Sequence, residues 1–326
     1  MGTEAEPPHI AVPEQLAQGG DVALGTPIAP GIPGRSGAQI ATKIVLYLLL
    51  LAVAAFYLLP FFWTISTSFK TLPESVQGFV LIPHHPTLSG YREVFVTGKF
   101  AHYAYNSAVF AISTTLLNLF LCTLGGYAFA RLRFPLREPL FMLVLATLMI
   151  PDQLRLVPVF QLLADFPSSI LSHIGPWDLP DWNLINTYQG YILLHLVYAT
   201  NLFLMRQYFL TIPRDYEEAA KLDSAGFFKT YWKVMLPLAG PAIAAVTILS
   251  FQGTWNDFYW QLILLQDEQH FTLNVGIARF ASAGGFKTDW PALMAASTLA
   301  IAPVGLIYLF FQRYFIAGVT TAGVKG

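Results

Sequence analysis

The 326-residue sequence has few charged residues, a single cysteine and no glycine-rich phosphate-binding loop ending in Lys-Ser or Lys-Thr. Asp, Glu, Lys and Arg make up 11% of the chain, whereas about a quarter of the residues in soluble domains are charged. The net charge of −1 gives no electrostatic basis for binding nucleic acid. Cys122 alone provides neither a disulfide framework nor a thiolate metal site. A chain that is 55% hydrophobic, with a mean hydropathy of +0.54, is instead predicted to lie in a bilayer.

The sequence contains several long runs without a charged residue. Five runs lack Asp, Glu, Lys and Arg and reach the roughly 20 residues that a helix needs to cross the hydrocarbon core. They are residues 44–69, 100–130, 182–205, 234–256 and 290–312. A sixth run, 139–163, is as apolar but carries Asp152 and Arg155.

We therefore predict an all-α polytopic membrane protein with six transmembrane helices. Their approximate ranges are 42–67, 103–129, 139–162, 186–207, 239–265 and 292–314. Lipid cannot satisfy the open edge of a sheet, and the runs are too long and continuous for barrel strands.

The distribution of Lys and Arg predicts the orientation. With the N-terminus inside, twelve of the 18 basic residues fall on the cytoplasmic side, three of them in the short loop RLRFPLRE at 131–138. Both termini are then cytoplasmic. Residues 1–38 are rich in Pro and Gly and predict a disordered cytoplasmic tail, without the basic n-region of a signal peptide. Residues 39–326 form the predicted transmembrane domain.

The stretch EEAAKLDSAG at 217–226 is unusually polar for this chain. Asp215, followed three residues later by Glu218, predicts a capping box at the start of a short helix. Glu217 and Lys221 lie one turn apart and would support each other weakly. Gly226 suits the left-handed residue that ends a helix.

A second short helix is expected next. We expect it to carry Phe228, Tyr231, Trp232 and Met235 on or near one face and to end at Pro237. Such a helix–turn–helix at the membrane surface could dock a partner, since alanines allow close approach. An ordinary amphipathic interfacial helix is the alternative.

The sequence EEAAKLDSAGFFKTYWKVMLPL resembles the coupling-loop signature of ABC importer permeases. That signature is Glu-Ala-Ala, three residues, Gly, nine residues, an aliphatic residue, any residue and Leu-Pro. Glu218-Ala219-Ala220, Val234 and Leu236-Pro237 match it. Ser224 stands where the signature has Gly, and Gly226 follows two residues later.

The resemblance implies a type I ABC importer permease fold, with a coupling loop at about 207–238. This loop would seat in a cleft of a cytoplasmic ATPase, two copies of which would carry ATP and Mg, while this chain binds no cofactor. The coupling residues that the resemblance implies are Glu217, Glu218, Ala219, Ala220, Asp223, Ser224, Gly226, Leu236 and Pro237.

Several other stretches resemble carbohydrate permeases. TWNDFYWQLILL at 254–265 is similar to their fifth-span segment. FTLNVGIARF, DWPALMAAS and the C-terminal QRYFIAGVTTAGVKG look like the smaller of the two paired permeases in the maltose-type branch. This implies import of a di- or oligosaccharide such as maltose, maltodextrin or trehalose across a bacterial or archaeal cytoplasmic membrane. It also implies a different sister permease and an extracytoplasmic sugar-binding protein as partners, besides membrane lipid.

The polar residues of the fifth span suggest a solute pathway. A charge at mid-bilayer costs about 2.5–3.5 kcal/mol, so Asn256 and Asp257 should face a bundle interior or a wet cavity. Trp255, Tyr259 and Trp260 offer flat apolar faces with polar tips, which suit a sugar. The alternative is an aromatic belt near the outer leaflet, with Asp257 capping or pairing inside the bundle.

Other polar residues within the spans allow two interpretations. Asn106 and Asn201 are expected to form hydrogen bonds between helices, although they could also line the pathway. Asp152 and Arg155 are three residues apart and are expected to form a structural ion pair rather than a gate. Pro151 and Pro158 flank them and predict a break or kink in the third span.

Two other classes of function compete with an importer permease. A secondary transporter or channel for a small polar solute would need acidic or histidine relay residues in several spans, and only Asp257 and the Asp152–Arg155 pair are candidates. A membrane-embedded enzyme would need paired carboxylates or a metal cluster, and the histidines have no ligand spacing. We therefore expect a transport subunit without catalytic or metal-binding residues.

Overall fold

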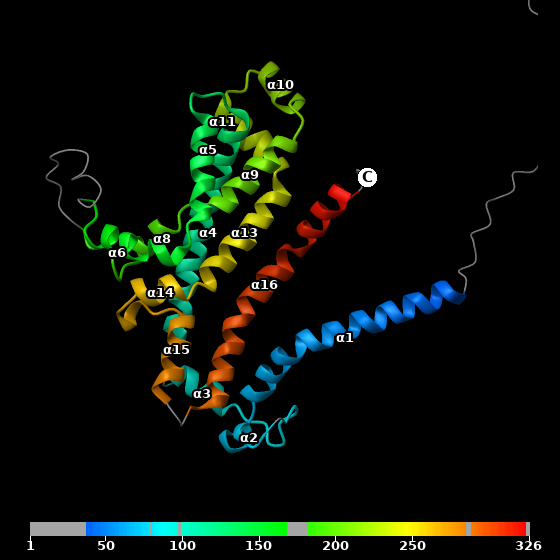
Figure 1. Cartoon of the computed structure of the whole chain (residues 1–326), viewed down its shortest axis with the longest axis vertical. Coiled ribbons are helices and arrows are strands. Elements are labelled where there is room, and N and C mark those ends of the chain that lie inside the picture. Colours follow the sequence, from blue (N-terminus) through cyan, green and yellow to red (C-terminus); the bar gives the residue numbers. More distant parts are fainter. Residues whose placement is uncertain (1–36, 79, 97–98, 168–181, 285–287, 324–326) are drawn as a thin grey trace, which may run out of the picture. The chain divides into compact units, whose positions relative to one another are not determined.

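The computed structural model of the chain describes residues 37–78, 80–96, 99–167, 182–284 and 288–323 (Figure 1). In these ranges the chain is helical or irregular, apart from an isolated bridge between Phe166 and Trp182. The all-α prediction is therefore confirmed. The chain forms two compact units, residues 1–57 and 58–326. Residues 1–36 of the predicted tail lie outside the described residues.

Three helices are long and apolar enough to cross a membrane. They are Ile40–Ser68 within α1 (Gly37–Ser68), α4 (Phe100–Arg131) and Trp290–Gln312 within α16 (Trp290–Gly323). They match the predicted first, second and sixth spans. Two bent pairs of helices would raise the number of spans to five if each pair counts as one.

The predicted third span is broken rather than continuous. It consists of α5 (Arg137–Ala146), η2 (Thr147–Met149), η3 (Asp152–Arg155) and α6 (Leu156–Ala164). The two halves meet at an angle of 100°. Of the two prolines that predict a break, Pro151 lies at it, because proline lacks an amide donor and pushes the residue before it out of the helical region. Pro158 lies inside α6 instead.

The predicted fourth and fifth spans are also interrupted. α8 (Tyr188–Leu194) and α9 (Ala199–Thr211) are separated by residues 195–198, and α13 (Gly240–Trp255) and α14 (Tyr259–Leu264) by residues 256–258. The prediction of continuous helices over 186–207 and 239–265 is therefore wrong. Neither break contains a proline, so the local residues offer little indication of them.

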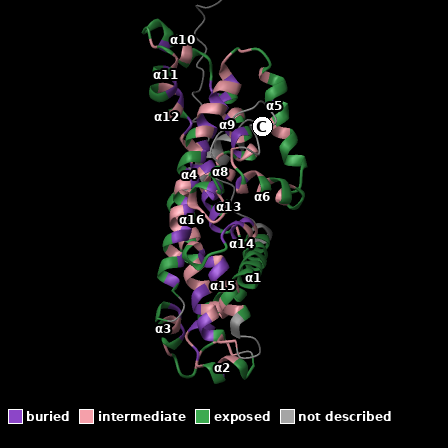
Figure 2. Ribbon diagram, turned by 90° about the vertical axis from the view of Figure 1, so that its left-hand side faces the viewer, coloured by how far each residue is buried: buried purple, intermediate pink, exposed green. Residues whose placement is uncertain are grey.

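Helices α4, α9 and α13 pack against one another and form the centre of the second unit (Figures 1 and 2). A Cβ on Gly126 of α4 would lie 2.6 Å from the Met205 Cβ of α9, so this glycine permits the close approach. Asn201 Nδ2 of α9 donates to Asn118 Oδ1 of α4 and to Ser250 Oγ of α13, both at 2.8 Å. The prediction that Asn201 forms hydrogen bonds between helices is confirmed.

The two ends of the second unit carry different elements (Figure 1). The segment that begins with α10 (Asp215–Leu222) lies at one end. At the other end lie α2 (Leu72–Val76), α3 (Ser89–Val96) and α15 (Leu273–Gly284).

Asn106 of α4 joins several elements near the end that carries α15. Asn106 Nδ2 donates to the carbonyl oxygens of Gln269 and Phe271 at 2.8 Å, and Asn106 Oδ1 accepts from the Tyr188 hydroxyl of α8 at 2.6 Å. Residue 269 belongs to η5 (Glu268–His270). The predicted hydrogen-bonding role of Asn106 is therefore confirmed.

Candidate functional site

A folded segment between α9 and α13 forms the first candidate site. α10 is followed by α11 (Phe227–Thr230), the π-helical turn η4 (Tyr231–Met235) and α12 (Leu236–Leu238). The prediction of a helix–turn–helix at 207–238 is confirmed.

The start of α10 differs from the predicted capping box. The amides of Glu217 and Glu218 donate to the Arg214 carbonyl oxygen at 2.9 Å and 3.0 Å, so Arg214 is the cap residue and Asp215 is already helical. The Arg214 side chain forms no capping hydrogen bond. The box is therefore wrong, but the carboxylates of Asp215, Glu217 and Glu218 still lie in the first turn, where the helix dipole favours negative charge.

The end of α10 is a Schellman turn built on Ser224. The Ser224 amide donates to the Lys221 carbonyl at 3.0 Å, and the Ala225 amide to the Ala220 carbonyl at 2.9 Å. Ser224 takes the left-handed φ of 56°, whereas Gly226 has φ −68° and caps α11. The prediction that Gly226 is the left-handed residue is wrong, because the helix ends earlier. Ser224 thus adopts the conformation that the signature glycine would favour.

The apolar residues after this turn divide between two faces. Tyr231 and Met235 are buried, and the Tyr231 hydroxyl lies 2.7 Å from Thr123 Oγ1 of α4. Phe228 and Trp232 are exposed. The prediction that all four lie on or near one face is wrong, because the chain is π-helical over Tyr231–Met235 and positions three apart no longer share a face as they do in an α-helix. Two aromatic rings are therefore exposed after the turn, and Tyr216 and Leu222 of α10 are exposed as well.

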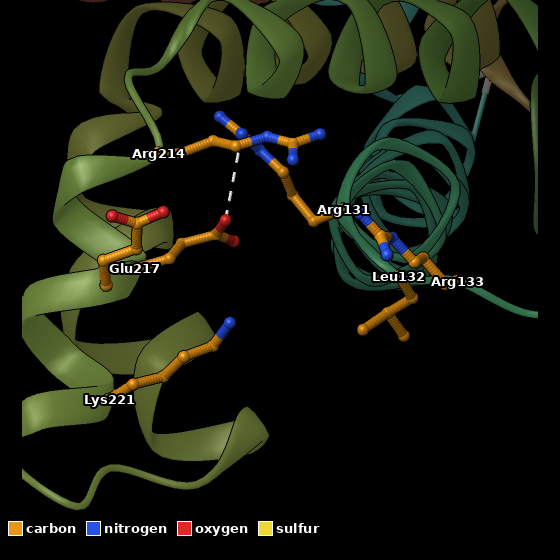
Figure 3. A pocket seen from close by; sticks show the side chains of 7 residues that line it. Arg131, Leu132, Arg133, Arg214, Glu217 and Lys221 are labelled. Carbon is orange, nitrogen blue, oxygen red and sulfur yellow. Dashed lines mark ion pairs between the residues drawn. The ribbon is translucent and has the colours of Figure 1, made fainter.

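The base of α10 contacts the end of α4 across a pocket of about 470 Å³ (Figure 3). Arg131 Nη1 lies 3.8 Å from Glu217 Oε2, and these side chains are only 5% and 13% exposed. Arg131 Nη2 also donates to the Phe209 carbonyl at 2.6 Å and to the Ile212 carbonyl. The expected pairing of Glu217 with Lys221 is therefore replaced by a pairing with Arg131.

The other residues of the predicted coupling set lie around this base. Glu218 lines the pocket and is exposed, as are Ala219, Asp223, Ser224, Gly226 and Pro237, while Leu236 is half-buried and Ala220 is buried. No finding tests their contact with an ATPase, so their coupling role stays a prediction. Sequence reasoning missed Arg131, which it used only as a sign of orientation.

A second candidate site lies where the three broken spans meet. A pocket of about 480 Å³ is lined by residues from all three breaks, among them Pro151, His195, Tyr198 and Asp257. Non-helical backbone within a membrane is tolerated only where it is buried in protein or lines a wet cavity. The convergence of the breaks on one pocket meets that condition.

Asp257 is the most connected side chain of this pocket. Its Oδ2 accepts from the Tyr191 hydroxyl at 2.7 Å and lies 3.5 Å from His195 Nε2. Its Oδ1 accepts from the Trp260 amide at 3.1 Å. Asp257 therefore pairs inside the bundle and borders the pocket at once. His195 was missed because a lone histidine in an apolar run carries no pattern.

The structure brings only part of the predicted solute pathway to this pocket. Asp257 and Trp260 line it. Trp255 is buried, and its indole donates to the Ala300 carbonyl at 2.9 Å. Asn256 is exposed at the end of α13, and Tyr259 packs edge-on against Trp260. Contact between these residues, or Asn106 and Asn201, and a solute stays a prediction.

Asp152 and Arg155 form the predicted ion pair, between Asp152 Oδ1 and Arg155 Nη2. Both also line the second pocket and are partly open to solvent there. The pair therefore adds one negative and one positive group to the pocket that Asp257 borders.

The chain matches a known family over most of its length. The family described as "binding-protein-dependent transport system inner membrane component" matches residues 122–321. The arabinooligosaccharides transport system permease protein AraQ of Bacillus subtilis (strain 168) is 33% identical over 288 residues, covering 87% of this chain and 96% of that protein. The diacetylchitobiose uptake system permease protein NgcG of Streptomyces coelicolor is 31% identical over 277 residues, covering 84% of this chain and 86% of that protein.

A solved structure shows the same fold. A chain in the crystal structure of a bacterial ABC transporter involved in import of the acidic polysaccharide alginate has a TM-score of 0.72 and 26% identity. The similarity covers 87% of this chain and 99% of that chain. The resemblance to carbohydrate ABC permeases is thereby confirmed. The chain belongs to the family of binding-protein-dependent transport system inner membrane components and has the fold of a type I ABC importer permease.

Proposed function

We propose that this chain is one permease subunit of an importer that moves a di- or oligosaccharide, such as maltose, maltodextrin or trehalose, across a bacterial or archaeal cytoplasmic membrane by alternating access. The observation that carries the proposal is the segment α10–α12, a folded polar element within an otherwise apolar chain. Two of the relatives named above are permeases for arabinooligosaccharides and diacetylchitobiose, which supports a saccharide.

The segment has the properties of a docking element. Exposed aromatic rings of Phe228 and Trp232 provide apolar contact area, and Glu218 and Lys221 of α10 provide exposed charges in the same segment. A helix with such a face fits a groove on a partner. We infer that the partner is a cytoplasmic ATPase, two copies of which carry ATP and Mg, while this chain binds no cofactor.

The other partners follow from the same proposal. A different sister permease completes the pathway, and an extracytoplasmic sugar-binding protein delivers the saccharide to the end that carries α2, α3 and α15. In this orientation α10 and both termini are cytoplasmic. The excess of basic residues on the side of α10 supports it.

A charge reversal tests the proposal in the assembled transporter. The chain, its sister permease and the ATPase are reconstituted in proteoliposomes together with the binding protein, and ATP-driven sugar uptake is measured. Glu218→Lys should abolish sugar-stimulated ATP hydrolysis while the chain still inserts. Uptake that needs no ATP in the unaltered complex, or unchanged coupling in Glu218→Lys, would overturn the proposal.

A further inference from the structure

We propose that the pocket between the three broken spans is a binding site of this subunit for an uncharged, hydroxyl-rich sugar unit, and that it discriminates against anionic solutes. This inference rests on the proposed function and adds where in this chain the solute is bound and which chemical class is favoured. It is carried by the geometry, the surfaces and the charges of the pocket.

The geometry matches that of a transporter binding site. Three helix breaks at 150–151, 195–198 and 256–258 turn non-helical backbone toward one pocket. In secondary transporters, solute sites are typically formed by such discontinuous helices near the midplane of the bilayer, and this pocket is built in the same way. At about 480 Å³ the pocket has the size of small-molecule sites.

The surfaces of the pocket match a sugar ring. Trp260 and Tyr198 supply aromatic surface for the C–H face of a pyranose or furanose. The Asp257 carboxylate and the Asp152–Arg155 pair supply acceptors and donors for hydroxyl groups.

The charges of the pocket disfavour an anion. The carboxylates of Asp152 and Asp257 share the lining with a single guanidinium, that of Arg155, which is already paired with Asp152. Protonation of His195 would bring the wall only to neutrality. A phosphate ester or a uronate would thus enter without an unpaired cation and beside the Asp257 carboxylate, whereas a neutral sugar meets no such repulsion.

A pair of glycine substitutions tests whether the pocket is occupied. Gly253 lines the pocket, and a Cβ there would meet only the Tyr198 hydroxyl, at 3.9 Å. The Cβ of Gly253→Leu therefore fits without a clash, and the rest of the side chain adds volume at the pocket wall. Gly305→Leu is the matched control, because Gly305 is also helical, is exposed and has nothing within 4 Å of its added Cβ.

The measurement is equilibrium binding of labelled arabinooligosaccharides, chitooligosaccharides and maltooligosaccharides to the whole transporter in nanodiscs, without the binding protein. Gly253→Leu should weaken binding of the imported sugar by about tenfold or more, and Gly305→Leu should leave it unchanged. Equal binding by both variants overturns the inference. If Gly253→Leu does not assemble, Tyr198→Phe and Asp257→Asn decide by the same criterion.

The charge argument has its own test. sn-Glycerol 3-phosphate and alginate oligosaccharides are compared with the neutral sugars in competition. Asp257→Asn should raise the affinity for the anions relative to that for the neutral sugar by about tenfold. Asp289→Asn is the control and should leave this ratio unchanged, because Asp289 lies outside the pocket and an asparagine there can still accept from the Ala292 amide. A preference of the unaltered complex for the anions would overturn the inference. Absence of ATP-driven uptake of any sugar would instead defeat the proposed function.

Discussion

Arg131, the last residue of α4, holds Glu217 of α10 at 3.8 Å and donates to the carbonyl oxygen of Phe209 near the end of α9 at 2.6 Å. One side chain thus joins three elements at the base of the segment α10–α12, the proposed coupling segment. Because both partners are largely buried, removal of one leaves a poorly compensated charge. Displacement of α10 should therefore be passed to α4 and α9 together.

Glu217→Gln tests this link. The variant keeps the shape of the side chain but removes the charge that Arg131 pairs with, so sugar transported per ATP hydrolysed should fall about fivefold or more. The ratio is measured in proteoliposomes.

Glu138→Gln is the control, since Glu138 pairs with Arg206 and Arg137 on the α5 side and is half exposed. An equal loss in both variants would mean that the effect is a general loss of charge. An unchanged ratio in Glu217→Gln would exclude Arg131 and Glu217 from coupling.

Ser224→Gly should stabilise the chain. Ser224 has a φ of 56°, which costs a residue with a Cβ more than it costs glycine. We expect a gain of about 0.5–1 kcal/mol in unfolding free energy, measured by thermal unfolding in detergent.

Two comparison variants sharpen this prediction. Ser224→Val should lower stability, because a β-branched residue fits the left-handed region poorly. Gly226→Ala should be tolerated, since Gly226 has φ −68° and a Cβ there meets nothing within 4 Å. If Gly226→Ala lost as much stability as Ser224→Val, the left-handed residue would be Gly226 and not Ser224.

The orientation can be tested through the single cysteine. Cys122 is buried, so Cys122→Ser provides a background in which one introduced thiol reports its side of the membrane. In intact cells Ser224→Cys should resist a membrane-impermeant thiol reagent and react after permeabilisation. Lys99→Cys places the thiol at an exposed position and should react in intact cells as well as in permeabilised ones. The reversed pattern would place α10 on the outer face.

An ion pair between Lys99 and Glu268 predicts a pH dependence of stability. Lys99 Nζ and the Tyr103 hydroxyl donate to the two Glu268 oxygens at 2.8 Å and 2.9 Å, and these hydrogen bonds hold the pKa of Glu268 below its ordinary value of 4.5. A depressed carboxyl pKa contributes stability that is present above the ordinary value and is lost as the pH falls through the lowered one.

The melting temperature should therefore decline on acidification below the ordinary Glu value, by a small amount because the pair is half exposed. Glu268→Gln should remove this part of the decline. Identical acid profiles for the variant and the unaltered chain would show that the contact does not stabilise the fold.

Sequence was sufficient where one local property decides the structure. The apolar length of residues 100–130 predicts α4, and Pro151 predicts the break of the third span. It failed at 195–198 and 256–258, because those breaks are stabilised by contacts that form only in the fold, such as Tyr191 with Asp257 and Asn118 with the Leu196 carbonyl.

The candidate sites show the same division. Spacing revealed the coupling segment, because its residues are consecutive. Arg131 pairs with Glu217, 86 residues away in sequence, and His195 pairs with Asp257, 62 residues away. No sequence periodicity connects residues so far apart. The Ser224 turn was misassigned for a different reason: Gly226 has the better intrinsic preference, and the hydrogen bonds of the helix end overrode it.

The glycine at position 126 has a mechanical consequence. Since even a methyl group there would collide with Met205, α4 and α9 touch almost backbone to backbone and cannot slide past each other without separating. α9 begins at the rim of the second pocket and ends just before α10, and its 13 residues span about 20 Å. Because this one helix connects the pocket to the segment α10–α12, we expect a tilt at one of them to move the other.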